Sequence, residues 1–421
     1  MRFTRPSSVN SRSEAQAIGA LGGARAWPVA IPGAGGPGAP RRTPALGAHG
    51  GRVPGRRGTA GAAGGGGAAV STFPPLPTVL VIPTGIGCQI GGYAGDGLPS
   101  ARLLAAASGC LITHPNVMNG AALYWSDPRI HYVEGWALDR FVAAELALEP
   151  VRRQRVGVLL DAGIDGDLLL RHRQVIEACR STLGLTIGPV VTTEMSLEVS
   201  LSLGPSGSSW GSLGRPGALL AAGEQLKEAG ATAIAVVSRF PDDPGRGALA
   251  AYRQGIGVDA LAGAEAVISH LLGRHLALPC AHAPALAPLP LDPDLDPRAA
   301  AEEIGTTFLP CVLVGLSRAP NLWPLAPGRP APPAGALLGP QIGAVVAPAG
   351  ALGGEAVLEA LDRGVPVIAV AGNPSLLAVN AEALGVKVLP AASYAEAAGW
   401  VLALREGIEP EALRRPLRPL P

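Results

Sequence analysis

Short apolar segments, each followed by a glycine-rich or polar loop and then by an amphipathic helix, recur at least four times along the chain. The clearest example begins with the apolar run Val79–Ile82, continues through a loop with glycines at 85, 87, 91, 92 and 95, and reaches a helix-like segment near Leu98. Similar apolar runs lie at 156–160, 185–191 and 233–237, and a further apolar run at 308–316 is also predicted to be a strand. This alternation predicts βαβ units and an α/β fold with a mostly parallel sheet.

The same alternation closes the chain, where apolar segments at 344–348 and 365–370 flank a helix-like segment. Before it, residues 324–333 hold five prolines, which is typical of an extended connector. We therefore predict a main α/β domain at 77–323, a proline-rich connector at 324–337 and a small C-terminal βαβ lobe at 338–421.

The first 75 residues differ in composition from the rest. Residues 1–79 contain nine arginines and one acid, Glu14, for a net charge of +8, whereas the whole chain carries +1. An Arg-rich, acid-poor segment without a periodic apolar face is typical of an organelle transit peptide followed by a disordered spacer. A disordered tail without a targeting role, or a start codon assigned too early, would have the same composition.

Composition also excludes several classes of protein. After residue 79 the net charge is −7, and the whole chain has two lysines, so nucleic acid is not expected as a partner. No apolar run reaches the ~18–20 residues that cross a bilayer, which predicts a soluble protein. The five cysteines are scattered and predict reduced thiols. Neither a cofactor nor an oligomeric state can be predicted.

Polar residues follow several of the predicted strands. Because ligands bind outside the carboxyl ends of parallel strands, these residues predict a pocket for a small molecule. The loop glycines leave the backbone open to a phosphate or nucleotide, although their spacing is neither G-x-G-x-x-G nor that of a P-loop. A tight turn that needs glycine for packing would look the same. The predicted ligand-binding residues are Thr84, Gly85, Gly87, Gly91, Gly92, Asp96, Asn116 and Asn119.

The densest polar group combines the segment His114–Asn119 with Glu134. A histidine beside a carboxylate is the usual arrangement for general acid/base catalysis, because the carboxylate orients the ring and raises its pKa. We therefore predict catalytic roles for His114 and Glu134. In the alternative, His114 binds a backbone carbonyl and the asparagines cap turns.

Other motifs have weaker functional indications. His270, Cys280, His282 and Glu265 could hold a metal, but the H-x₉-C-x-H spacing matches no standard zinc pattern, and no metal site is predicted. Cys280 or Cys88 as a nucleophile stays open. We interpret Asp161, Asp165 and the pair at 242–243 as cap or turn residues. The polar loop 206–214 is expected to be a mobile flap, whose Trp210 either stacks on a planar ligand or fills the core.

Several longer phrases resemble a known family. I-P-T-G-I-G…G-G-Y-A-G-D at 82–96, L-I-T-H-P-N-V-M-N-G at 111–120 and P-C-A-H-A-P at 279–284 are similar to an uncharacterised cyanobacterial and plastid family that is known as a domain of unknown function. The resemblance covers nearly all of residues 78–421. It implies a photosynthetic lineage, and hence a chloroplast for a chain with a leader, but it implies no activity.

Together these observations predict a plastid protein that binds a small anionic metabolite, phosphate- or nucleotide-bearing, in a strand-end cleft. An enzyme that uses acid/base chemistry is the first hypothesis. A non-catalytic metabolite-binding or assembly protein is the alternative, and a metal-dependent hydrolase built on His270 and His282 is the third.

Overall fold

The computed structural model describes residues 73–120, 124, 126–242, 247–304, 307–417 and 419. The chain divides into two units, Met1–Gly67 and Ala68–Pro421, and the described residues all belong to the second. Nearly all of the predicted leader therefore lies outside the described residues, and the leader stays a prediction. Within the described part of the chain, no helix is both long enough and apolar enough to cross a membrane.

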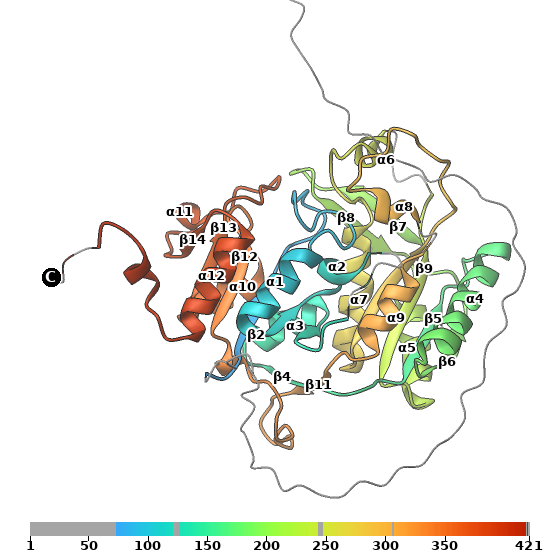
Figure 1. The fold of residues 1–421 in the computed structure, drawn as a ribbon. Helices are drawn as coiled ribbons and strands as arrows, with labels where there is room; N and C mark the ends of the chain where they lie inside the picture. Colours follow the sequence, from blue (N-terminus) through green and yellow to red (C-terminus); the bar gives the residue numbers. More distant parts are fainter. Residues whose placement is uncertain are drawn as a thin grey trace, which may run out of the picture. The chain divides into compact units, whose positions relative to one another are not determined.

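The first sheet has six parallel strands in the order β14-β13-β12-β1-β2-β3 (Figure 1). They are β1 (Leu76–Leu80), β2 (Gly109–Thr113), β3 (Ile130–Tyr132), β12 (Ala344–Pro348), β13 (Val367–Val370) and β14 (Leu389–Ala391). In β1, Thr78 lies opposite Leu111 of β2 on one side and Ala344 of β12 on the other. The winding of the chain reverses between β1 and β12, and such a switch point is where open parallel sheets bind ligands.

The second sheet has four parallel strands in the order β10-β9-β5-β6. They are β5 (Val156–Leu160), β6 (Ile187–Thr192), β9 (Ala233–Arg239) and β10 (Cys280–Ala285). Two antiparallel pairs lie outside the sheets: β4 (Leu146–Glu149) with β11 (Asn321–Pro324), and β7 (Val199–Leu203) with β8 (Ser209–Leu213). The predicted α/β fold with parallel strands is confirmed, but the strands form two sheets.

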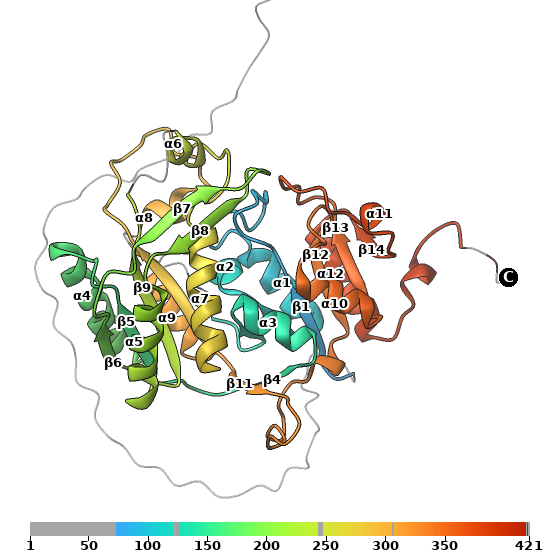
Figure 2. The ribbon, with the colours of Figure 1, turned by 180° about the vertical axis from the view of Figure 1, so that it is seen from behind.

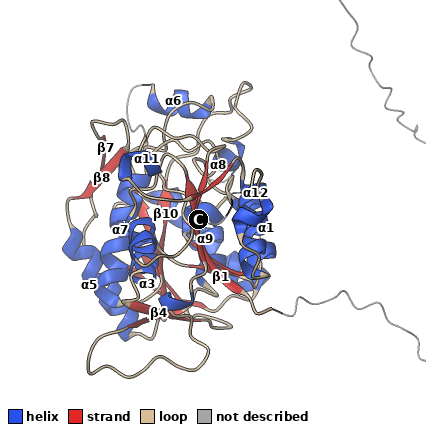
Figure 3. Cartoon of the chain, turned by 90° about the vertical axis from the view of Figure 1, so that its left-hand side faces the viewer, coloured by secondary structure: helices blue, strands red, loops and turns tan. Residues whose placement is uncertain are grey.

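Helices lie on both sides of the strands (Figure 3). The helices of eight or more residues are α1 (Leu98–Ser108), α3 (Gly135–Val142), α4 (Gly166–Leu183), α5 (Pro216–Glu228), α7 (Ala262–Leu276), α9 (Leu309–Leu316), α10 (Glu355–Asp362) and α12 (Tyr394–Arg405). Shorter ones are α2 (Pro115–Met118), α6 (Ala248–Arg253), α8 (Ala300–Ile304), α11 (Ala381–Leu384) and the 3₁₀ turns η1 (Gly339–Gln341) and η2 (Pro410–Leu413).

One hydrophobic cluster joins the two sheets. It combines residues of β1 and β2 with residues of β5, β9 and β10, and it includes four buried residues of α9, among them Val312 and Leu316. α1 and α12 contribute to the same cluster from the first sheet, and α4 contributes from the second. The opposite face of the first sheet packs against α3 and α10 (Figure 2), and that of the second sheet packs against α5 and α7. This shared core brings the strand ends of the two sheets together.

The C-terminal βαβ unit is present, but it does not form a sheet of its own. Its strand β12 pairs with β1, so residues 338–421 extend the first sheet, and the predicted boundary at 338 divides one sheet. Pairing satisfies the backbone donors and acceptors that a separate three-stranded sheet would leave open along its edge.

Two segments have a different secondary structure from the predicted one. The apolar run 308–316 was predicted as a strand and forms helix α9, because an apolar run that is buried on all sides has no periodicity to separate the two structures. The predicted flap 206–214 instead supplies most of the β7–β8 hairpin. Its Trp210 is 59% exposed and does not fill the core.

The hairpin and helix α7 approach each other closely. A Cβ atom at Gly263 would lie 2.5 Å from Trp210 Cα and 2.7 Å from the Ser209 carbonyl oxygen, so only glycine fits there. Ser209 Oγ accepts from Gly263 N–H and donates to the Ala260 carbonyl, while Ser209 N–H donates to the Gly85 carbonyl. Ser209 thereby fastens the hairpin both to α7 and to the loop after β1.

Candidate functional site

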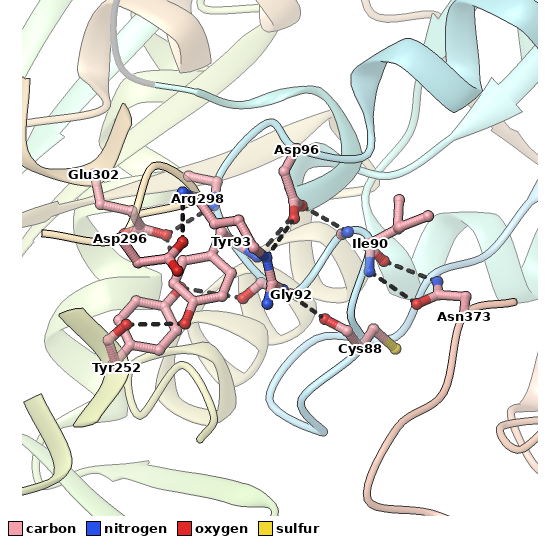
Figure 4. A network of polar contacts seen from close by, with 12 residues as sticks. Cys88, Ile90, Gly92, Tyr93, Asp96, Tyr252, Asp296, Arg298, Glu302 and Asn373 are labelled. Carbon is pink, nitrogen blue, oxygen red and sulfur yellow. Dashed lines mark hydrogen bonds and ion pairs between the residues drawn. The ribbon is translucent and has the colours of Figure 1, made fainter. Parts of the chain in front are cut away.

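The glycine-rich loop after β1 uses its own backbone donors internally. Asp96 accepts from the N–H groups of Gly91 at 2.6 Å and Tyr93 at 3.4 Å, and Glu302 accepts from Ala94 N–H at 2.7 Å (Figure 4). Gly91 has a left-handed backbone, with φ of 83°. The glycines predict a loop whose N–H groups bind an anionic ligand. In the structure, these N–H groups donate to carboxyl groups of the chain itself.

Aromatic and charged side chains hold this loop against the segment 252–302 (Figure 4). The rings of Tyr93 and Tyr252 stack with centroids 4.2 Å apart, and the Arg298 guanidinium lies 4.3 Å from the Tyr93 centroid. Tyr252 donates its hydroxyl to Glu302 at 2.8 Å. Residues that are 160 to 210 positions apart in the sequence thus fix the loop that follows β1.

Asn373 holds the same loop from the other side. Its Oδ1 accepts from Ile90 N–H and its Nδ2 donates to the Ile90 carbonyl, both at 2.8 Å. The side-chain amide therefore pairs with Ile90 as a neighbouring strand would, and Nδ2 also donates to the Tyr394 hydroxyl at 2.9 Å. With 1% of its surface exposed, Asn373 positions the loop and is closed to a ligand.

A polar cavity of about 40 Å³ lies where the strand ends of the two sheets meet. Among the predicted ligand-binding residues, those that line it are Thr84, Gly91, Gly92, Asn116 and Asn119. The opposite wall carries four ionisable residues, Asp259, Glu265, His282 and Glu302. The other predicted ligand-binding residues, Gly85, Gly87 and Asp96, do not line this cavity. Gly85 contacts Ser209, Gly87 packs against 257–258 and Leu376, and Asp96 orders the loop.

A larger cavity of about 140 Å³ shares part of this lining. The residues that line both cavities are Asp259, Leu261, Pro284, Glu302 and Phe308. Beyond them the larger cavity is mainly apolar, with Leu249, Val258, Leu286 and Leu289 on its walls. We call the two together the strand-end cleft. It has a wide apolar part and a narrow polar end.

Burial of several carboxyl groups together raises the pKa values of two of them at the polar end. Burial, reinforced by Glu265 and Asp96, raises the pKa of Glu302 to about 7, although the Ala94 N–H and the Tyr252 hydroxyl oppose that rise. Burial next to Glu265 and Glu302 raises the pKa of Asp259 well above its usual range. At neutral pH this end of the cleft therefore holds exchangeable protons.

Glu265 and His282 form a hydrogen-bonded pair on the cavity wall. Glu265 Oε2 lies 3.1 Å from His282 Nε2, and Ser269 Oγ lies 2.7 Å from His282 Nδ1. Ser269 is 3% exposed and does not line the cavity, so it orients the imidazole from behind and is not placed as a nucleophile. A carboxylate and an imidazole that share a proton beside a cavity can act as a general acid/base pair.

Both residues predicted to be catalytic have structural partners instead. His114 Nε2 accepts from Ile82 N–H at 3.1 Å, and burial lowers the pKa of His114 to about 4. Glu134 caps helix α3 by accepting from the N–H groups of Trp136 and Ala137, and it lies 3.0 Å from His270 Nε2. Neither His114 nor Glu134 lines the strand-end cleft.

The structure also bears on the metal, thiol and aspartate candidates. Among the residues that the structure describes, no three His, Cys, Asp or Glu side chains lie close enough together to hold a metal ion. Burial raises the pKa of Cys88 to about 12 and that of Cys280 well above its usual range, which disfavours the thiolate that a nucleophile needs. Asp242 binds Arg239 and the Ala287 N–H, whereas Asp243 lies outside the described residues.

Sequence reasoning missed Asp259 and Glu302 as cavity residues. Asp259 lies in a glycine-rich stretch without periodicity, and Glu302 follows the segment 284–297, which contains five prolines. The one sequence signal for Glu302 is the acidic pair that it forms with Glu303. Glu265 and His282 were recognised as a polar group, but a metal site was the only role considered for the two together.

The fold and the cleft define an α/β protein with a small-molecule-sized cavity between the carboxyl ends of two parallel sheets. The model of the family described as "Protein of unknown function (DUF3326)" matches residues 77–414, and the chain belongs to this family. One relative, from Synechococcus sp., is 54% identical over 338 residues, which cover 80% of this chain and 93% of the relative; it is described as an uncharacterised lipoprotein. No solved structure matches the chain.

Proposed function

We propose that the protein binds a small organic molecule in the strand-end cleft and that Glu265 and His282 move a proton to or from it. The observation that carries the proposal is the position of this pair. The two side chains are 3.1 Å apart and line the same cavity as Thr84, Asn116 and Asn119, which come from the other sheet. Acid/base catalysis needs a proton-accepting group within reach of the bound molecule, and a cavity wall provides that reach.

The polar groups around the pair can orient a ligand. Tyr132 donates its hydroxyl to Asn119 Oδ1 at 2.9 Å, so Nδ2 is the group that Asn119 can offer to a bound molecule. The pair itself can accept or donate, depending on where the shared proton lies. The free backbone donors that a bound phosphate would need are scarce, since Asp96 and Glu302 occupy those of Gly91, Tyr93 and Ala94. The loop therefore offers little support for an anionic ligand.

A thermal-shift screen of metabolites on the full chain, followed by turnover assays of each hit, tests this proposal. A ligand at about 100 times its Kd should stabilise the protein by roughly 2.7 kcal/mol. Glu265→Gln and His282→Gln are expected to lower turnover by about 10²–10⁴-fold and to retain ligand-induced stabilisation, because the amide keeps the shape but cannot accept the proton.

The exposed Glu228→Gln is the matched control and should keep wild-type turnover. Loss of turnover in Glu134→Gln but not in Glu265→Gln would move the chemistry to the α3 cap and contradict the proposal. If every hit binds in the cleft and none is turned over, the protein is the non-catalytic binding protein that the sequence left as an alternative.

We also propose that residues 1–75 direct the chain to a plastid. The support is the excess of arginine over acid in this segment and the relative from Synechococcus sp.. A fusion of residues 1–75 to a fluorescent protein should accumulate in plastids of plant or algal cells. Diffuse cytosolic fluorescence would contradict this assignment and would leave the cleft proposal untouched.

A further inference from the structure

The two parts of the strand-end cleft differ in size and chemistry. The larger part, about 140 Å³, is close to the ~150 Å³ that accommodates benzene in an apolar protein cavity. Its walls carry Leu249, Val258, Leu286 and Leu289. It therefore fits one six-membered ring or an equivalent branched chain. The narrow end, about 40 Å³, leaves room for a head group of one or two heavy atoms.

Charge at the junction of the two parts is unbalanced. Asp259 and Glu302 line both parts, and Glu265 lines the narrow end. Glu302 accepts from the Tyr252 hydroxyl and the Ala94 N–H, and Asp259 accepts from the Leu261 N–H. These partners are neutral, so hydrogen bonds satisfy the two carboxyls, but within the described part of the chain no arginine or lysine pairs with them.

Among the residues that the structure describes, the arginines near the cleft are already paired with other acids. Arg253, on the wall of the larger part, makes a two-point ion pair with Glu303, with its Nε 2.6 Å from Oε1. Arg239 pairs with Asp242 at 2.5 Å, and Arg298 lies 3.8 Å from Asp96. These described arginines are thus matched outside the junction. Glu265 has His282 as its partner, so Asp259 and Glu302 are left either to hold a proton or to bind a cationic ligand.

We infer that the cleft takes an organic monocation: a protonated amine or amidine attached to an apolar body of about six to eight heavy atoms. The cationic head lies at Asp259 and Glu302, beside the Glu265–His282 pair, and the body fills the larger part. This inference rests on the proposed function and names its ligand class. Such a ligand differs from a metal ion held by a cluster of side chains, since within the described ranges no three His, Cys, Asp or Glu side chains converge to metal-binding distance.

Protons and the ligand compete for the same carboxyls. Burial raises the pKa of Glu302 to about 7 and that of Asp259 well above its usual range, so protons neutralise the junction when no ligand is bound. The other titratable groups that face these two are Glu265, Asp96 and Tyr252, with His282 beside Glu265. A cation that displaces one proton binds more tightly as the pH rises, by up to about tenfold per pH unit.

Three ligands of the same shape test the charge requirement on the full chain: benzylamine, benzyl alcohol and benzoate. Isothermal titration and ligand-observed NMR at pH 6, 7 and 8 give their affinities. Benzylamine is expected to bind about tenfold or more tightly than benzyl alcohol at pH 8, because a hydrogen bond to a charged group contributes that much. Benzoate should bind most weakly. The affinity for benzylamine should rise between pH 6 and pH 8, whereas that for benzyl alcohol should not.

Variants locate the head and the body separately. Glu302→Gln, which keeps an acceptor for Tyr252 and Ala94, should weaken benzylamine about tenfold and leave benzyl alcohol unchanged. Asp259→Asn should act in the same direction, and Glu228→Gln is the control with an equal change of charge at an exposed site. Leu249→Trp fills the larger part and should abolish binding of all three ligands.

Binding of benzyl alcohol or benzoate as tight as that of benzylamine would overturn the cationic class; if Leu249→Trp still removed it, binding in the cleft would stand. Binding of benzylamine that survives both Leu249→Trp and Glu302→Gln would overturn the inference, and so would the absence of any benzylamine binding at millimolar concentration. A different result would contradict the proposed function: hits of the metabolite screen whose binding is unchanged in the cleft variants.

Discussion

Replacing Asp161 with alanine is expected to lower the free energy of unfolding by about 3–5 kcal/mol, because three buried donors lose their acceptor. Asp161 is fully buried at the end of β5. Its Oδ1 accepts from the N–H groups of Gly163 at 2.8 Å and Leu197 at 3.0 Å, and its Oδ2 accepts from Arg239 N–H at 3.0 Å. Alanine removes both oxygens, so the three N–H groups lose the acceptor with which they pair.

Urea denaturation of the full chain, followed by circular dichroism, measures this loss. Asp161→Asn should be intermediate, because the amide keeps one oxygen and turns an NH₂ group toward a donor. The matched control is Asp165→Ala: Asp165 is exposed at the N-cap of α4 and makes no capping hydrogen bond, so the change should stay within about 0.5 kcal/mol. Equal effects of Asp161→Ala and Asp165→Ala would contradict this account.

Asp161 also illustrates what a strand-end residue does in this fold. The sequence places it directly after an apolar run, and the expectation of a cap residue was close, since it caps the backbone of the turn that it begins. Its bonds to Leu197 and Arg239 connect β5 to the segment that follows β6 and to the last residue of β9. No local pattern contains such long-range partners, because they depend on how the strands are ordered in the sheet.

The alternation of apolar runs and loops predicted the central strands well, because strands such as β9, β12 and β13 are short, buried on both faces and rich in β-branched residues. It could not predict that the strands divide into two sheets. That division depends on which strands form hydrogen bonds with each other. One such pair, β1 with β12, joins residues more than 260 positions apart. Likewise α9 was mistaken for a strand, since burial on all sides removes the periodicity that distinguishes a helix.

The sequence predicted residues on one wall of the candidate site but not on the other. The wall from the first sheet followed from the strand-end rule, and Thr84, Asn116 and Asn119 do line the cavity. The wall with Asp259 and Glu302 did not, because no sequence rule brings a loop after β9 and a short helix near residue 300 to the end of β1. A histidine and a carboxylate close together in the sequence, His114 and Glu134, were instead used for structure: one accepts from a strand-end N–H, and the other caps a helix.

Glu134 has a consequence for stability that can be measured. Its carboxyl is 5% exposed, and burial raises its pKa to about 8, even though the N–H groups of Trp136 and Ala137 oppose that rise. In the unfolded chain the group titrates near 4.5. Between these two values the folded state holds a proton that the unfolded state has released. The stability that protonated Glu134 contributes is therefore fully present below about pH 4.5 and is lost as the pH rises through about 8.

Two histidines set the limit on the acidic side. Burial lowers the pKa of both His114 and His131 to about 4, so the folded state keeps them neutral where the unfolded chain protonates them. Their contribution is present above about pH 6.5 and is lost as the pH falls toward 4. We therefore expect Glu134 to lower the stability of the wild-type protein on the alkaline side and the two histidines to lower it in acid.

Glu134→Gln should flatten the alkaline limb. At one unit of pKa per about 1.4 kcal/mol, Glu134 accounts for roughly 3–5 kcal/mol of the stability that the wild type loses between pH 5 and pH 9. The glutamine keeps an oxygen for the Trp136 N–H and does not ionise, so the stability of the variant should be within about 1 kcal/mol of wild type at pH 5 and should exceed it at pH 9.

Urea denaturation at intervals of one pH unit measures both curves, with Glu228→Gln as the exposed control that should follow the wild type. The slope that remains in Glu134→Gln includes Glu302 and Asp139, whose pKa values burial raises to about 7 and about 6, and Asp259, whose pKa it raises well above its usual range. Parallel curves for wild type and Glu134→Gln would show that the α3 cap is ionised in the folded state at neutral pH, because only a proton held by Glu134 itself makes the two curves diverge.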